Sequence, residues 1–191
     1  MLPGARNKLE DARTILQQLE GVTDFPAFRS LFNSFLSAAR AITYALQKDA
    51  KKLRGFTEWY AEKQAQMTAD DLLRFIHDAR IEDFHKGRHA LDSFTYIHHF
   101  SPEEAGPSPA PGALPVIGAE GAFWIVDEGT PRERRIPIKA GSFVTMIRIA
   151  NPPRMHMGRV LERADPLSIC RLALAYLENL VHEAESRFAT D

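Results

Sequence analysis

The 191-residue chain has little of several features that would assign a function directly. Cys170 is its one cysteine, so no intrachain disulfide can form and a reducing, cytoplasmic setting is expected. Because Cys170 lies among apolar residues in a strongly helical stretch, we expect a buried, unreactive thiol. No apolar run approaches the roughly 18 residues of a membrane span, and the N-terminus lacks the apolar run of a signal peptide. We therefore expect no membrane partner.

Sequence motifs for several common chemistries are also missing. The chain contains no phosphate-cradling glycine loop, no nucleophile elbow and no Cys/His zinc pattern. These absences argue against nucleotide hydrolysis, serine hydrolase chemistry and zinc fingers. We expect no cofactor.

Charge of either sign is not in excess, because 24 basic residues nearly balance 25 acidic ones. No general field would therefore attract nucleic acid or an anionic surface, and any contact with RNA must be local. Arg132, Arg134 and Arg135 form one such local cluster and are candidate substrate-binding residues for phosphate. The alternative interpretation is a solvated edge of a hairpin.

Apolar residues recur at helical spacing in four stretches of the first hundred residues. The first runs from Arg6 to about Gln18, and the second follows Thr23 and Asp24, which can cap it. The third covers 56–66. The fourth follows a capping-box pattern formed by Thr68 and Asp71. Residues 1–100 are therefore predicted to form a helical bundle.

The composition changes after residue 100. Five prolines lie between Ser101 and Pro115, so 101–116 is expected to be a Pro-rich linker. In 117–191, the runs "GAFWIVDEG", "RRIPI" and "SFVTMIRI" predict a three-stranded antiparallel β meander. A last helix opens with Asp165 as cap and Pro166 at its first position, and its broad apolar face should pack back on the bundle. The predicted class is α+β, mainly α, in one integrated domain.

One motif of the fourth helix points to chemistry. In "DARIEDFHKG", Arg80 and His85 match the pattern R-x-x-x-x-H, and a helical bundle with this element resembles the HEPN superfamily (higher eukaryotes and prokaryotes nucleotide-binding). The resemblance implies a metal-independent endoribonuclease whose motif helices face each other in a homodimer. Arg80 would then hold the scissile phosphate of RNA. His85 would act as general base or acid on the ribose 2′-hydroxyl or the leaving oxygen.

Helix geometry bears on that interpretation. Five steps of about 100° separate the two side chains by ~140° on a straight helix, so one chain forms no compact dyad without a distortion or a partner. The motif therefore leaves open whether the chain is an enzyme. The alternative is a non-catalytic interaction or sensor protein in which the same helix mediates dimerisation.

A metal-binding helical protein is a further alternative. Glu82, His85 and His89 follow each other at spacings of three and four, near one helix face, and these side chains can ligate a transition metal. A ferritin-like site would need a second Glu-x-x-His motif, which the sequence lacks. Surface histidines exposed to water are the competing interpretation.

Two longer segments carry a broader resemblance. The text from "FRSLFNSFLSAARAITYALQK" to "DLLRFIHDAR", together with "NPPRMHMGRVLE" and "DPLSICRLALAYLENLVHEAE", resembles a family of bacterial proteins that has no assigned activity. That resemblance implies the same order of helices, Pro-rich loop, small sheet and terminal helix. His156, within "NPPRMHMG", is expected to be a packed loop histidine, with a place in a cleft as the alternative.

Overall fold

The computed structural model describes residues 2–86, 89–99, 106–118, 121–138 and 142–188, and the side chains at 84–86, 95–99, 118, 121 and 142–145 lie outside this description. The chain divides into two compact units. The helical unit comprises Met1–Leu91 and Ile149–Asp191, and the strand unit comprises Asp92–Arg148.

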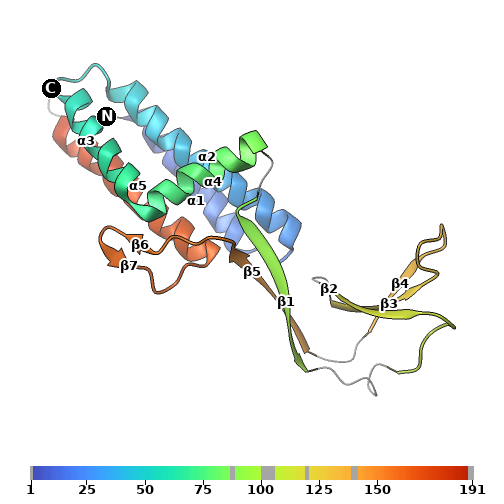
Figure 1. Ribbon diagram of the computed structural model, residues 1–191. Helices are drawn as coiled ribbons and strands as arrows, with labels where there is room; N and C mark the ends of the chain where they lie inside the picture. The colour runs from blue at the N-terminus through green and yellow to red at the C-terminus, as the bar shows by residue number, and fades with distance from the viewer. Residues whose placement is uncertain (1, 87–88, 100–105, 119–120, 139–141, 189–191) are drawn as a thin grey trace. The chain divides into compact units, whose positions relative to one another are not determined.

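Within the described residues, the helical unit contains five helices and one short hairpin, and Figure 1 shows how they follow each other along the chain. The helices are α1 (Pro3–Glu20), α2 (Phe25–Ala50), α3 (Phe56–Ala69), α4 (Asp71–Lys86) and α5 (Pro166–Phe188), and the hairpin joins β6 (Met155–His156) to β7 (Arg159–Val160). Helices α1 and α2 pack along each other, and α5 packs on both. The expectation that the last helix returns to the bundle is confirmed. None of the described helices has the length and apolar character needed to cross a membrane.

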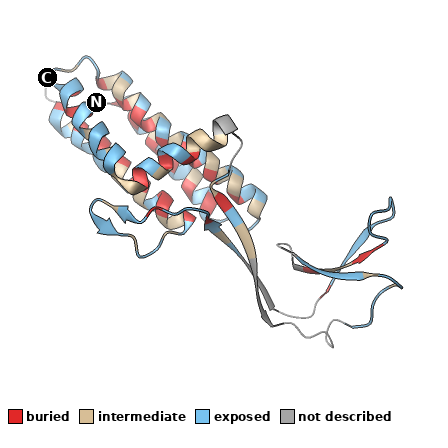
Figure 2. Cartoon of the chain, in the orientation of Figure 1, coloured by how far each residue is buried: buried red, intermediate tan, exposed pale blue. Residues whose placement is uncertain are grey.

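The core of the helical unit is built from the predicted apolar stripes (Figure 2). Each fully buried Phe, Leu or Ile side chain stabilises the fold by about 1.5–3 kcal/mol. The largest side chains that are removed from water are Leu19, Phe32, Phe35, Leu36, Ile42, Leu46, Leu72, Ile169 and Val181. An aromatic cluster closes the end of the unit where α3 begins, with ring centroids 5.5–5.6 Å apart in its closest pairs, and consists of Phe56, Trp59, Tyr60 and Phe188.

Side-chain caps fix where the helices begin. Asp24 accepts a hydrogen bond from the backbone N–H of Ala27 (2.9 Å), and Asp165 accepts one from that of Ser168 (3.0 Å), as predicted. The expected capping box at Thr68 is wrong. Helix α3 continues through Thr68, whose hydroxyl donates to the Gln64 carbonyl, and Asp70 caps α4 instead.

The strand unit contains most of the β structure. Strands β2 (Leu114–Gly118), β3 (Gly121–Val126) and β4 (Arg134–Pro137) form an antiparallel meander in that order, so Pro137 lies on an edge strand. Strand β5 (Ser142–Ile149), expected as the third strand of the meander, pairs instead with β1 (Leu91–His99). Strand β1 replaces the last part of the predicted bundle, and β2 begins inside the expected linker. The predicted class, α+β and mainly α, is confirmed.

Candidate functional site

A cleft of about 370 Å³ opens in the helical unit among α2, α3, α4 and α5. This volume is in the range that small-molecule ligands occupy. Apolar side chains form much of its surface and include Leu36, Ala39, Met67, Leu73, Ile76, Ala173 and Leu177. A ligand bound there would place an apolar part against these side chains and a polar part against the groups described next.

One wall carries a chain of hydrogen bonds between α2 and α3. Arg40 Nη1 donates to Thr43 Oγ1 (3.1 Å), and the Thr43 hydroxyl donates to the Arg40 carbonyl (2.9 Å). Gln47 Nε2 then links the Thr43 carbonyl (3.1 Å) to the Tyr60 phenol oxygen (3.2 Å). Helical spacing places Arg40 beside Leu36, Ala39 and Thr43, so the guanidinium lies at the margin of the buried stripe.

The opposite wall is a face of α4. Leu73, Ile76, His77 and Arg80 line the cleft at the spacing i, i+3, i+4 and i+7, which is one side of an α-helix. Arg74, on the same wall, pairs with Asp71 (2.7 Å). Arg80 is half-buried and is one of the residues that line the cleft.

Positive charge exceeds negative charge in the cleft. Among the described residues that line it are the guanidinium groups of Arg40, Arg74 and Arg80 and the carboxylate of Asp78, and Arg74 is paired with Asp71. Burial raises the pKa of the Tyr60 phenol, and the hydrogen bond with Thr43, the charge of Arg40 and the hydrogen bond with Gln47 oppose that rise. Tyr60 is therefore a neutral hydrogen-bonding group at physiological pH. The cleft offers cations, neutral polar groups and apolar surface together.

Three of the helices that line this cleft, α2, α3 and α4, lie in the part of the chain that matches a known family. A model of the family described as bacteriophage lambda protein ea47 matches residues 2–107, more than half of the chain. The chain belongs to this family. The ea47-type region covers α1 to α4, and therefore Arg40, Tyr60 and Arg80, whereas the β6–β7 hairpin and α5 follow it. Comparisons with curated proteins and with solved structures found no match.

The predicted site residues fall in different places. Arg80 and His85 both belong to α4, but the His85 side chain lies outside the described part of the structure. Arg132, Arg134 and Arg135 are exposed residues of the strand unit. Arg134 and Arg135 are consecutive on β4, so their side chains leave opposite faces of the sheet and do not form one patch on either face.

Glu82, His85 and His89 were the candidate metal ligands, and the described side chain of His89 contacts a carboxylate of α4. His89 Nδ1 lies 2.9 Å from Asp83 Oδ1, and Asp83 also accepts a hydrogen bond from Asn33. No group of three or more metal-ligating side chains occurs within the described residues, which exclude the side chain of His85. Cys170 is fully buried, and burial raises the pKa of its thiol, as an unreactive cysteine requires.

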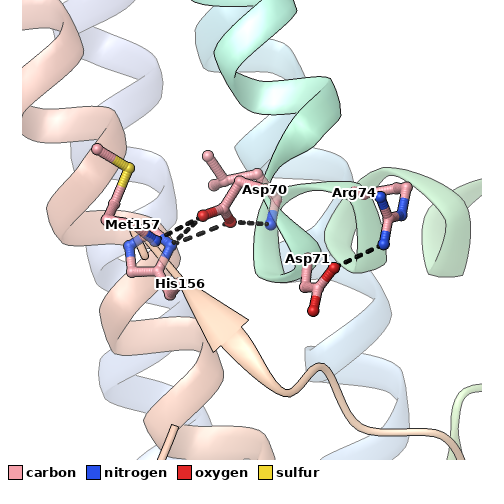
Figure 3. Close-up of polar contacts among 6 residues, drawn as sticks. Asp70, Asp71, Arg74, His156 and Met157 are labelled. Atoms are coloured by element: carbon pink, nitrogen blue, oxygen red, sulfur yellow. Dashed lines mark hydrogen bonds and ion pairs between the residues drawn. The ribbon is translucent and has the colours of Figure 1, made fainter. Parts of the chain in front are cut away.

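Sequence reasoning missed two features of the helical unit. The first feature is the presence of Arg40 and Tyr60 in the lining of the cleft. The sequence pattern that could have indicated Arg40 is a cationic residue at the border of an apolar helical stripe. The second feature is the pairing of Asp70 with His156, drawn in Figure 3, which joins the start of α4 to the hairpin. No local pattern links these two residues, because 86 positions separate them.

Proposed function

We propose that the helical unit is an HEPN-like RNA-binding module and that the cleft between α2 and α4 receives one nucleotide of the RNA. The observation that carries the proposal is the presence of Arg40 and Arg80 around an apolar cavity of about 370 Å³. A nucleotide combines a flat apolar base with an anionic phosphate, so it needs both kinds of surface in one site. A guanidinium binds phosphate through two parallel hydrogen bonds.

The polar wall suits the remaining part of the nucleotide. The Tyr60 phenol and the side chains of Gln64 and Thr68 supply donors and acceptors for the ribose hydroxyls or the base edge. The apolar lining supplies area for the base. In this arrangement Arg80 contacts the phosphate, and Arg40 neutralises the same charge from α2.

Cleavage is the catalytic form of the same proposal. His85 of one protomer accepts the proton of the ribose 2′-hydroxyl while the 2′-oxygen attacks the phosphorus, and Arg80 stabilises the negative charge that develops on the phosphate. The bond between the phosphorus and the 5′-oxygen then breaks, and the partner's His85, in its protonated form, donates a proton to that leaving oxygen. Because ~140° separates the two residues on one straight helix, this proposal assigns the facing pair to a homodimer. No metal takes part.

Binding is tested with a short fluorescent single-stranded RNA and the full chain. Arg80→Ala and Arg40→Ala each remove one charge-assisted contact, so we expect about tenfold weaker binding, equivalent to about 1.4 kcal/mol. Arg13→Ala is the matched control, because Arg13 lies on α1, away from the cleft, in contact with Glu10 and Glu178. Equal effects of all three substitutions would refute a specific role of the cleft.

Cleavage is tested separately on the same RNA. We expect activity that persists in a chelator and disappears in both Arg80→Ala and His85→Ala. Light scattering should show a dimer for the active protein. Cleavage that survives either substitution would reject the assigned residues, and a stable monomer would reject the composite site.

A further inference from the structure

A second hollow of the helical unit lies between the β6–β7 hairpin and the first turns of α5. Its volume is about 690 Å³, larger than that of the cleft. Arg159 belongs to β7, Arg163 lies in the segment between β7 and α5, and Ser168 and Arg171 belong to α5. We call this hollow the hairpin groove.

The hairpin groove carries unneutralised positive charge. Among the described residues that line it are the guanidinium groups of Arg159, Arg163 and Arg171 and the carboxylate of Glu162. Arg171 is paired with Glu20 (2.8 Å). Within the described part of the chain, Arg159 and Arg163 make no ion pair, and both are exposed. Two cations are therefore available to a ligand in the groove.

The hairpin is held in place before any ligand binds (Figure 3). The carboxylate of Asp70 accepts hydrogen bonds from the backbone N–H of Met157 (2.7 Å) and from Nδ1 of His156 (3.1 Å). His156 also packs edge-on against Tyr176, with ring centroids 6.1 Å apart. A preformed hairpin loses less conformational freedom on binding than a mobile loop does, so Arg159 on β7 binds more tightly.

The turn of the hairpin is conformationally demanding. Met157 and Gly158 both have positive φ, 49° and 75°, as a two-residue type I′ turn requires. Glycine adopts this conformation readily, whereas a methionine is strained there by about 1–2 kcal/mol. The Asp70 hydrogen bond to the Met157 N–H offsets this cost and fixes the direction of the strand that carries Arg159.

We propose that the hairpin groove binds the phosphodiester backbone of a nucleic acid through Arg159 and Arg163. A nucleic acid carries closely and regularly spaced anions, so one short segment engages several guanidinium groups at once. Arg159 and Arg163 line the same hollow, so one extended polyanion that lies along it can contact both guanidinium groups. The proposal goes beyond the cleft, because it requires neither cleavage nor a nucleotide bound near Arg80.

The test compares the full-length protein with Arg159→Gln/Arg163→Gln. Binding of a labelled single-stranded RNA and of a labelled DNA duplex is measured by fluorescence anisotropy at several salt concentrations. For the RNA, we expect at least about tenfold weaker binding and a salt slope reduced by about 1.4, which corresponds to two lost phosphate contacts. Arg13→Gln/Arg187→Gln is the matched control, since it removes the same charge from α1 and the end of α5.

Arg40→Gln/Arg80→Gln separates this proposal from the one for the cleft. If only the hairpin variant weakens binding, the groove proposal stands and the cleft proposal fails; the reverse result overturns the groove. Circular dichroism and thermal melting confirm that each variant is folded. The groove proposal is also overturned if neither nucleic acid binds, if the control variant weakens binding equally, or if only mixed phosphatidylcholine and phosphatidylserine vesicles bind.

Discussion

Asp70 and His156 are joined by a hydrogen bond of 3.1 Å between Oδ1 and Nδ1, although they lie 86 positions apart in the chain. The same carboxylate accepts the backbone N–H groups of Leu73 (3.0 Å) and Met157 (2.7 Å). One buried side chain therefore caps α4 and anchors the β6–β7 hairpin. The position of the hairpin groove depends on this contact.

Replacing Asp70 should destabilise the protein measurably. Asp70→Ala removes a helix cap and two further hydrogen bonds to a nearly buried carboxylate, whose side chain is only 8% exposed, so we expect a loss of about 2–4 kcal/mol. Chemical denaturation gives the free energy of unfolding. Asp71→Ala is the matched control, because Asp71 pairs only with Arg74 among the described residues and should cost less than about 1 kcal/mol. Similar losses in both variants would contradict the anchoring role of Asp70.

The contribution of Asp70 should depend on pH. Burial opposes ionisation, but the hydrogen bonds from Met157, Leu73 and His156 outweigh it and lower the pKa of the carboxyl. A lowered carboxyl pKa stabilises the fold above the unfolded value of about 3.9, and this stabilisation is lost as the pH falls through the lower folded-state value. The stability difference between the wild type and Asp70→Asn should therefore be constant above about pH 5 and shrink below about pH 4. If the stability difference between the two proteins grew as the pH fell, the pKa of Asp70 would be raised in the folded state and not lowered.

Two glycines at helix ends should respond differently to substitution by alanine. Gly55 precedes α3 with φ +76°, so Gly55→Ala is strained even though no atom lies within 4 Å of the added Cβ. We expect a loss of about 1–2 kcal/mol. Gly21, at the end of α1, has φ −91°, and its added Cβ would meet only the Gln18 carbonyl at 3.7 Å. Gly21→Ala should leave the stability unchanged or raise it slightly, and thermal denaturation of both variants measures the difference.

Cys170 should be protected from thiol reagents in the native state. The side chain is fully buried, and burial raises the pKa of the thiol, so little reactive thiolate forms at neutral pH. A colorimetric thiol assay should detect no reaction in buffer and one thiol per chain in denaturant. Rapid modification of the folded protein would show that the packing around α5 is looser than described.

The candidate sites show where prediction from sequence stops. The spacing of Leu73, Ile76 and Arg80 indicates that they share one face of a helix, and the structure places this face along the cleft. The sequence does not indicate that Arg40 and Tyr60 complete the same cavity, because helices α2 and α3 approach α4 only through tertiary packing. The pairing of β5 with β1 was missed for a similar reason, since strand partners are chosen by long-range contacts.

The sequence by itself determined the local elements of this protein. Apolar residues at helical spacing set the buried stripes, and Asp24 and Asp165 set where two helices begin, because caps act within three residues. The cap of α4 is local in the same way, because Asp70 accepts the Leu73 N–H three residues on, whereas tertiary structure alone decided the distant bond between Asp70 and His156. It also decided the cleft and the hairpin groove. The cleft and the hairpin groove form where helices and the hairpin pack against each other, and this packing brings together residues that no short sequence pattern connects.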